Sequence, residues 1–268
     1  MIADLVATIP DGSTLAIAQD AVGVAMAATR ELVRRGARDL HLVCVPISGL
    51  QADVLIGAGC VATIETSAVT LGEFGTAPRF AAALKRGTIR VKDATCPAIH
   101  AALQAGQKGI PFIPLRGLIG SDLLRHRHDW KVIDNPFADG DDPIVLLPAI
   151  RPDFALFHAP LADRHGNVYI GRQRDLLTMA QAAQRTLVTV EAVTDDDLMR
   201  DEAGGAGVIP AIYVTGIAVA PGGARPLKFP GHYALDEGAL ANYAAAAQSD
   251  AGFRSWLDAW LAMELQAA

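Results

Sequence analysis

The stretch Asp153–Gly171, DFALFHAPLADRHGNVYIG, contains two strand-like apolar runs joined by a polar loop. The first run, Phe154–Phe157, places His158 at a predicted turn, and the second run is Val168–Ile170. The loop is longer and chemically richer than a two-residue hairpin turn requires. It predicts either a binding or catalytic loop, or a loop whose Asp and Asn side chains cap their own backbone. Its polar and glycine positions are Asp163, Arg164, His165, Gly166 and Asn167.

Bulk composition indicates a compact α/β protein. The chain has 268 residues, of which 51% are hydrophobic and 19% are charged, so it is long enough to bury a large core. The formal net charge of −6 disfavours broad nucleic-acid binding, which needs a basic surface. An anionic small molecule remains compatible, because a local basic cluster can coexist with an acidic total.

The cysteines and the termini suggest a reduced environment. The three cysteines contain no CxxC pair, and Cys44 and Cys60 lie in apolar runs typical of small core residues. No basic leader segment precedes an apolar stretch, and no apolar run approaches the roughly 20 residues of a membrane span. We therefore expect a cytoplasmic protein. We expect no metal site, because there is no HExxH motif and His126 and His128 are only two apart.

Apolar strands alternate with helices of about ten residues along most of the chain. This alternation predicts an α/β fold with an open, mostly parallel sheet flanked by helices on both faces. Predicted strands are 15–18, 39–46, 61–65, 88–92, 110–115, 144–147, 154–157 and 187–190. Predicted helices are 22–35, a helix from about 51 that ends at the glycines 57 and 59, 77–86, 97–105 and 176–184.

The C-terminal region reads as two Ala-rich amphipathic helices over residues 236–265. Trp256 and Trp260 are four residues apart, which places them on one helical face suited to docking. We expect one domain over residues 1–268, with residues 235–268 as a helical extension packed on it.

Three motif matches are weak. Gly57–Ala62 fits the dinucleotide pattern GxGxxA, but a strand follows it where a helix is needed. Ser121 lacks the second glycine of the hydrolase motif GxSxG. The cluster Arg125–His128 predicts a solvated face or, alternatively, a phosphate contact.

The stretch Gly109–Asp122, GIPFIPLRGLIGSD, is the second informative segment. Pro111 and Pro114 stiffen an extended run that ends at Arg116. The glycines that follow permit close backbone approach to a ligand, and exposed N–H groups before Ser121 would suit an anion or oxyanion. The competing interpretation is a strand-to-helix turn in which Ser121 or Asp122 caps the helix.

Together these stretches resemble the A (alpha) subunit of family I coenzyme A transferases, of the glutaconate CoA-transferase type. The patterns GxPFxPxRxxxGSD and HAxxADxxGN are fairly specific for that group, and the resemblance runs from about Asp11 to Tyr233. Four further segments contribute to it: 11–14 (DGST), 150–153 (IRPD), 190–191 (VE) and 221–224 (PGGA).

The resemblance implies an enzyme that moves CoA between an acyl-CoA and a free carboxylic acid. A glutamate attacks the thioester, and covalent acyl-enzyme and enzyme–CoA intermediates follow. In the family that glutamate belongs to the B (beta) subunit, so no catalytic residue is expected in this chain. The implied partner is a beta subunit, in an αβ or α2β2 complex. No tightly bound cofactor is expected, and the CoA thioester is a substrate.

By the same resemblance, Arg116 would bind a substrate carboxylate through a forked pair of hydrogen bonds. Gly120 and Ser121 would line the acyl site. Asp163, His165 and Asn167 correspond to the family's ordered loop, with a supporting role.

Two features depart from the family pattern. A Gly-Gly-Phe segment usually follows the first strand, whereas here residues 16–23 read AIAQDAVG, which closes space where backbone approach is expected. A related branch of ring-opening hydrolases acting on CoA thioesters has an alpha-subunit glutamate near positions 95–97, where this chain has Cys96. We therefore favour the transferase, with the hydrolase as the alternative.

Two further alternatives remain open. Glu65 and Glu73 are carboxylates near element ends, so either could be a self-contained nucleophile, or a surface or capping residue. The chain could also be a non-catalytic CoA-ester-binding or scaffold protein with this fold, a hypothesis motivated by the altered Gln19-Asp20 segment.

Overall fold

The computed structural model describes residues 1–200 and 205–263. In this part of the chain, nine strands form one sheet, in which β12, β10, β8, β1, β2, β3 and β4 are successive parallel neighbours. Two short strands are antiparallel: β9 pairs with the C-terminal part of β8, and β11 pairs with β9. The strands are β1 (Thr14–Ala18), β2 (Leu40–Val45), β3 (Val61–Thr66), β4 (Arg90–Asp93), β8 (Phe154–Asp163), β9 (Val168–Tyr169), β10 (Arg185–Thr194), β11 (Val208–Ile209) and β12 (Gly216–Val219).

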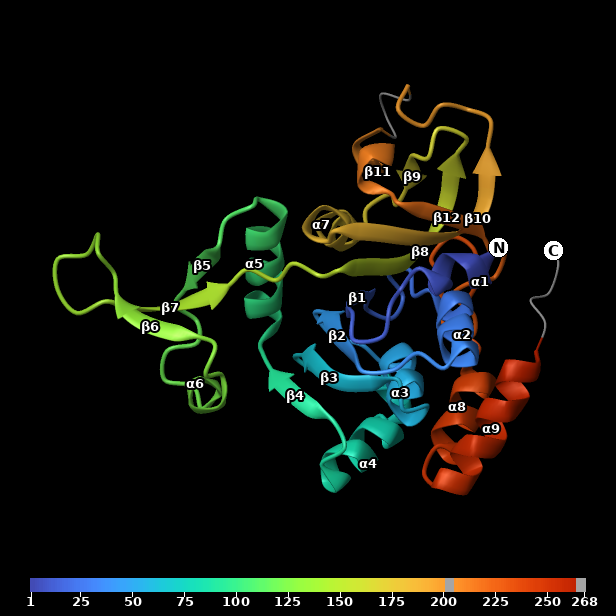
Figure 1. The fold of residues 1–268 in the computed structure, drawn as a ribbon, viewed down its shortest axis with the longest axis horizontal. Helices are drawn as coiled ribbons and strands as arrows, with labels where there is room; N and C mark the ends of the chain where they lie inside the picture. The colour runs from blue at the N-terminus through green and yellow to red at the C-terminus, as the bar shows by residue number, and fades with distance from the viewer. Residues whose placement is uncertain (201–204, 264–268) are drawn as a thin grey trace.

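Helices cover both faces of this sheet, as the alternating pattern predicts (Figure 1). On one face the core joins the sheet to α1 (Ile2–Ala7), α2 (Met26–Arg35), α3 (Leu50–Gly57), α4 (Pro78–Arg86), α8 (Glu237–Ala246) and α9 (Asp250–Ala262). On the other face lie α5 (Cys96–Gln107) and α7 (Arg174–Ala182). The expected C-terminal helix pair is confirmed through Ala262, and residues 264–265 lie outside the described residues.

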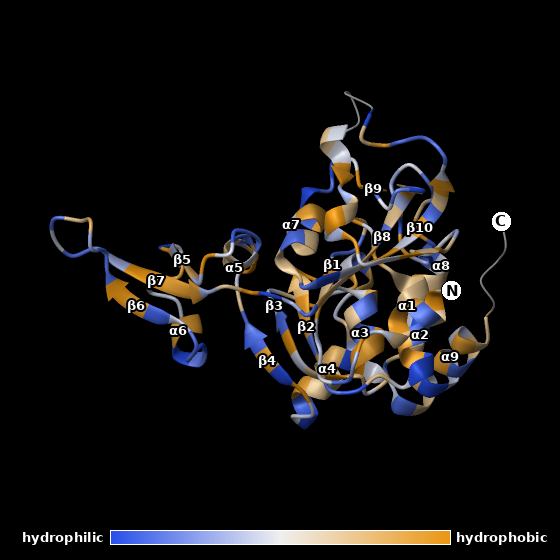
Figure 2. Ribbon diagram, turned by 45° about the horizontal axis from the view of Figure 1, so that its top comes forward, coloured by the Kyte–Doolittle hydropathy of each residue, from blue (hydrophilic) through white to orange (hydrophobic). Residues whose placement is uncertain are grey.

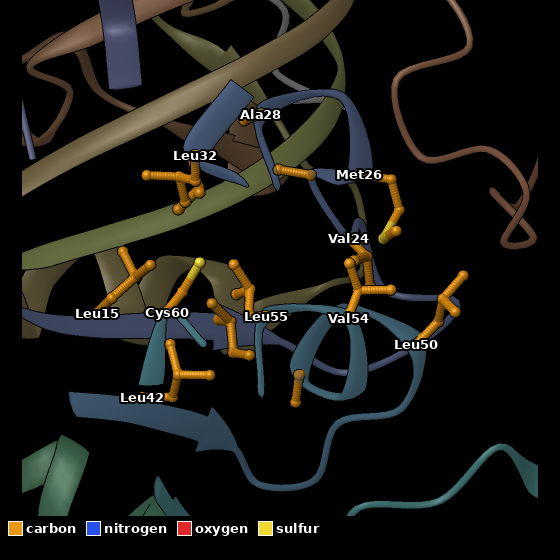
Figure 3. Packing of buried hydrophobic residues seen from close by; sticks show 14 of the residues in the cluster. Leu15, Val24, Met26, Ala28, Leu32, Leu42, Leu50, Val54, Leu55 and Cys60 are labelled. Atoms are coloured by element: carbon orange, nitrogen blue, oxygen red, sulfur yellow. The ribbon is translucent and has the colours of Figure 1, made fainter. Parts of the chain in front are cut away.

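The core confirms the expected role of two cysteines. Cys60 lies among Leu15, Leu42 and Leu55 (Figure 3), and both Cys44 and Cys60 are buried. Burial of such apolar side chains supplies most of the free energy that holds sheet and helices together.

Glycine ends two of the predicted helices. Gly36 follows α2 and Gly87 follows α4, each with a left-handed backbone (φ 72° and 64°) that an L side chain disfavours. The predicted start of α2 at Val22 is wrong, and the helix begins at Met26. Ala21 (φ 65°) and Gly23 (φ 126°) break any helix before that point.

A separate antiparallel sheet was not predicted. β5 (Phe112–Leu115), β7 (Pro143–Pro148) and β6 (Lys131–Asp134) pair in the order β5-β7-β6. With α6 (Leu123–His126) they form an arm, residues 110–148, that projects from the body beyond α5 (Figures 1 and 2). The predicted strands 110–115 and 144–147 therefore belong to the arm and not to the parallel sheet. Short apolar runs do not reveal which strands they pair with.

α5 connects the arm to the body. Its Ile99 and Leu103 pack in the core of the main sheet, whereas Ala98 and Ala102 pack against arm residues Val145 and Leu147. The arm therefore projects from a shared helix.

The strand after Asp153 is longer than predicted. β8 continues through His158 to Asp163, so His158 lies in mid-strand, with no exposed surface, and not at a turn. The reason is β10, which pairs with β8 in register from Arg185–Phe154 to Thr194–Asp163 and extends it. No helix in the described ranges is long and apolar enough to cross a membrane.

Candidate active site

The carboxyl edge of the main sheet gathers polar side chains from four consecutive strands. Asp20 follows β1, Ser48 follows β2, Ser67 follows β3 and Cys96 follows β4. Parallel strands end at the same edge, where α/β proteins commonly bind ligands. Direct contacts confirm the convergence: the Ser67 hydroxyl lies 3.1 Å from the Cys96 Sγ, and the Ser48 N–H donates to the carbonyl of Ala68 at 3.2 Å.

Asp20 is a buried carboxyl group at this edge with a raised pKa. Burial raises its pKa to about 6, although the N–H groups of Leu50 and Gly49 hydrogen-bond to the carboxylate and oppose the shift. Its Oδ1 is buried and has no hydrogen-bond partner within the described residues. A Cβ on Gly49 would lie 2.3 Å from Oδ2, so this approach requires glycine. Asp20 can therefore exchange a proton near neutral pH.

The backbone beneath Asp20 keeps a glycine-like path despite the departure at residues 16–23. Ala21 adopts φ 65°, a conformation that is costly for a residue with a Cβ. The Gly23 carbonyl accepts the His158 N–H at 2.7 Å, and a Cβ at Gly23 would lie 2.2 Å from the His158 oxygen. The loop after β1 is thus pinned to β8, which fixes the position of Asp20.

Cys96 is the first residue of α5 and is exposed. The Thr95 hydroxyl caps the helix by accepting the Ala98 N–H at 3.3 Å. The resemblance places a hydrolase glutamate near this position, and the structure has a thiol there, beside the Ser67 hydroxyl. Within the described residues, neither side chain of this pair is hydrogen-bonded to a carboxylate.

Glu65 is held in a buried ion-pair cluster. Its carboxylate lies 2.7 Å from Arg127 and 3.3 Å from Lys92, and Arg127 also pairs with Asp129 at 2.9 Å. The Arg127 guanidinium stacks on Trp130, with its Cζ 4.1 Å from the ring centroid. A carboxylate neutralised in this way is a poor nucleophile. The role of Glu65 that these contacts indicate is structural, because they join β3 to the segment after α6.

The predicted solvated face is wrong for Arg127. Its side chain is only 4% exposed, whereas that of Arg125 is 80% exposed. Arg127 is buried because its guanidinium pairs with Glu65 near the carboxyl edge of the sheet. The position of Arg127 in the sequence does not reveal this contact. Glu73, the other candidate nucleophile, lies exposed in the short 3₁₀ turn Gly72–Phe74.

The first predicted site group lies on the arm, after β5. Arg116 is 67% exposed and pairs with Asp142 at 2.6 Å. Gly120 has φ 80°, and the space where its Cβ would lie is open. The Ser121 hydroxyl donates to the Leu118 carbonyl at 2.8 Å. The loop therefore presents a guanidinium to solvent beside a glycine that a ligand can approach.

The second predicted group forms the loop between β8 and β9. The Asp163 carboxylate accepts the N–H groups of His165, Asn167 and Leu198 and the Asn167 side-chain amide, at 2.8 to 3.1 Å. The Asn167 side-chain oxygen, Oδ1, accepts the Ala211 N–H at 2.9 Å. Burial opposes ionisation of Asp163, but these hydrogen bonds outweigh it and lower its pKa. His165 has an exposed side chain.

Sequence reasoning missed a buried network around His158. Its Nε2 lies 2.7 Å from Glu191 Oε1, and its Nδ1 lies 2.9 Å from the Thr189 hydroxyl. Glu191 also accepts the Tyr233 hydroxyl and the Gly222 N–H, both at 2.8 Å. Because a carboxylate only accepts, Nε2 bears the proton and Nδ1 accepts from Thr189. The available signal in the sequence was that His158 and Glu191 each directly follow a predicted apolar strand, 154–157 and 187–190.

The pKa values of this network favour a neutral imidazole beside a carboxylate. Burial lowers the pKa of His158 against the opposing influence of Glu191. Burial alone would raise the pKa of Glu191, but the hydrogen bonds from His158, Gly222 and Tyr233 lower it to about 2. Three donors occupy this carboxylate, so the pair holds the loop after β12 to the sheet.

The structure does not bring the two predicted groups together. The arm loop with Arg116 and the β8–β9 loop with Asp163 lie on separate parts of the molecule (Figure 1). No group of three or more His, Cys, Asp or Glu side chains in residues 1–200 and 205–263 is arranged to hold a metal ion.

Solved structures define the class to which this fold belongs. Glutaconate coenzyme A-transferase from Acidaminococcus fermentans matches with a TM-score of 0.89 and 26% identity, over 97% of this chain and 87% of that one. A variant of the decarboxylase AibA/AibB matches with a TM-score of 0.85 and 32% identity, over 98% of this chain and 97% of that one.

Sequence comparison agrees. The model of the family described as coenzyme A transferase matches residues 1–220. The alpha (A) subunit of 3-oxoadipate CoA-transferase from Pseudomonas knackmussii is 31% identical over 258 residues, which cover 94% of this chain and 88% of that protein. This chain belongs to the coenzyme A transferase family.

Proposed function

We propose that this chain is the alpha subunit of a heteromeric CoA-transferase that moves CoA between an acyl-CoA and a free carboxylic acid. A beta-subunit glutamate attacks the thioester carbonyl and releases CoA thiolate, leaving an enzyme–acyl anhydride. The thiolate attacks the glutamyl carbonyl and expels the first acid. The second acid then takes the CoA by the reverse steps.

One observation supports a nucleophile from the partner. Within the described residues, the two glutamates nearest the carboxyl edge, Glu65 and Glu191, are each held by several donors, so neither is free to attack. The edge nevertheless offers a proton-exchanging carboxyl group, a thiol and hydroxyls. It is equipped to shape and polarise a bound thioester, and a beta subunit would complete it.

Arg116 has the chemistry to bind the acid. Its exposed guanidinium can form two parallel hydrogen bonds with a carboxylate, and its only carboxylate contact within the described residues is the surface pair with Asp142. Gly120 and Ser121 lie four and five residues further along the same loop and would line the acyl site. The β8–β9 loop, with Asp163, His165 and Asn167, would have a supporting role in its own part of the fold, apart from Arg116.

The test is to purify this chain together with its genomic partner and assay acyl exchange. We expect transfer of CoA from an acyl-CoA to an added carboxylic acid, with no net loss of thioester. Incubation with acyl-CoA alone should add CoA covalently to the partner, and borohydride should reduce that glutamyl thioester. Turnover with no covalent adduct, or CoA binding with no turnover, would contradict the proposal.

A decarboxylase is the second candidate. The observation that favours it is the extent of the match to AibA/AibB, a decarboxylase, at higher identity than glutaconate CoA-transferase. Release of CO₂ from an acyl-CoA, with the thioester intact, would identify it. Cleavage of a ring ketone would instead identify the hydrolase alternative, for which Cys96 is an unfavourable replacement.

A further inference from the structure

A large pocket lies between α2, the C-terminal helices and the loop after β12, and Glu191 of β10 is part of its lining. Its volume is about 780 Å³, within the range of small-molecule sites. None of Asp20, Ser48, Ser67 and Cys96 lines it. The residues that define its chemistry are Arg30, Arg225, Glu191, Asp236, Trp256 and Trp260.

Arg30 is a buried cation without a counter-ion. The residue is 7% exposed, and within residues 1–200 and 205–263 its guanidinium forms neither an ion pair nor a hydrogen bond. Its nearest aromatic contact is Trp260, whose ring centroid lies 5.9 Å from Cζ. A buried charge that lacks a partner is costly, and arginine cannot relieve the cost by losing its proton. This position is therefore suited to an anion.

The other charges in the pocket also favour an anion. Glu191 is satisfied by three donors, and the Asp236 carboxylate accepts the Ala239 N–H at 2.9 Å as the cap of α8. Arg225 lies over Tyr233, with its Cζ 4.5 Å from the ring centroid, and it has no carboxylate partner in the described ranges. Two guanidiniums are thus available, whereas both carboxylates already accept hydrogen bonds.

Two tryptophans line one side of the pocket. The rings of Trp256 and Trp260 stack with centroids 5.4 Å apart and planes at 17°. Trp260 also adjoins Arg30, so a planar group and an anionic group could be held side by side. Apolar contact between a ligand ring and these indoles would add specificity to the charge-assisted contact.

We propose that this pocket is a second ligand site, which binds a small organic anion by pairing its carboxylate or phosphate with Arg30 and packing its planar ring against Trp256 and Trp260. Its lining shares no residue with the cluster of Asp20, Ser48, Ser67 and Cys96. It does not depend on the activity proposed above.

Isothermal titration calorimetry on the complex of the full chain with its partner subunit tests this proposal, with small molecules as the titrants. The probes are benzoate and phenyl phosphate, with neutral benzamide and inorganic phosphate as the ring-only and anion-only controls. We expect one ring-bearing anion to bind saturably, one per chain, and to quench tryptophan emission. Both controls should bind at least about tenfold more weakly, because benzamide lacks the negative charge and inorganic phosphate lacks the ring. The better of the two anions identifies the preferred head group.

Variants locate the binding. Arg30→Met should raise the dissociation constant of the better probe about tenfold or more, and Arg30→Lys should raise it less. Arg35→Met is the matched control, because Arg35 lies on the same helix but pairs with Asp11 outside the pocket. If Arg30→Met does not fold, Arg225→Met, at an exposed position, must still weaken binding.

Three results would overturn the proposal. They are the absence of saturable binding of either anion up to about 10 mM, equal affinity for the neutral ring, and unchanged affinity in the folded arginine variants.

Discussion

Arg116 combines high exposure with a single surface ion pair, so its contribution to folding is small. Arg116→Ala should raise the KM for the acid substrate about tenfold, because a forked carboxylate contact is lost. The free energy of unfolding should change by less than about 0.5 kcal/mol. Steady-state kinetics and urea denaturation measure the two effects.

Arg125→Ala is the matched control for Arg116, since Arg125 is an exposed arginine on the same arm. It should leave the KM unchanged. Equal effects of the two substitutions, or unfolding of the Arg116 variant, would exclude a specific carboxylate contact.

Burial of Asp20 should make the folded protein less stable as the pH rises, which is the opposite of the usual effect of a carboxyl group. Its folded pKa of about 6 exceeds the unfolded value of 3.8, so the folded state binds more protons between these values. The contribution of this group to stability is therefore present below about pH 4 and is lost as pH rises through 6. Asp20→Asn removes the titration, and relative to wild type the variant should gain about 2 to 3 kcal/mol between pH 4 and pH 7.

Urea denaturation of both proteins at a series of pH values measures the difference, and other titrating groups cancel in it. A difference that does not vary with pH would show that Asp20 titrates normally.

The carboxylate of Asp163 holds the β8–β9 loop in place. Asp163→Ala leaves four N–H donors without their acceptor, two of them on the buried Asn167, which should cost about 2 to 4 kcal/mol of unfolding free energy. His165→Ala should cost less than about 0.5 kcal/mol, because that side chain is exposed. Thermal and urea unfolding provide the comparison. A stable Asp163→Asn variant that loses all turnover would instead indicate a catalytic carboxylate.

Elements with strong local signals were predictable. The helix stops at Gly36 and Gly87 follow from the left-handed backbone that glycine accepts, and Pro97 marks the first turn of α5. β6 was not predicted, because all four of its residues are exposed and it has no apolar alternation. The length of β8 was underestimated because its second half is stabilised by pairing with β10, far along the chain.

The arm gives the whole molecule an asymmetric shape and leaves apolar side chains unpaired. Phe112, Val132, Ile133 and Phe137 are 47%, 52%, 39% and 95% exposed, and Figure 2 shows the hydrophobic colour on these strands. Several large apolar side chains exposed on one small element are typical of an interaction site. We expect the beta subunit to bury part of the arm.

The combined substitution Val132→Lys and Phe137→Asp should abolish co-purification of the beta subunit without destabilising this chain, because both positions are exposed in the isolated fold. Size-exclusion chromatography and urea denaturation measure the two effects. Leu84→Lys on α4, at a position 47% exposed, is the control and should leave assembly intact. Retention of the complex by the arm variant would place the interface elsewhere.

The sequence by itself determined the class of fold, the helix stops and the family. It did so because these depend on local patterning, on glycine and proline geometry, and on motifs contiguous in the chain. It also identified Arg116 and Asp163 as notable residues, since each lies within such a motif.

Only the tertiary structure decided which groups meet. It separated the Arg116 loop from the Asp163 loop, buried Arg127 against Glu65, and left Arg30 facing a pocket without a counter-ion among the described residues. Pairing between distant strands and the burial of charge depend on contacts far apart in sequence. Their free energies are set by the folded environment, and no local pattern encodes them.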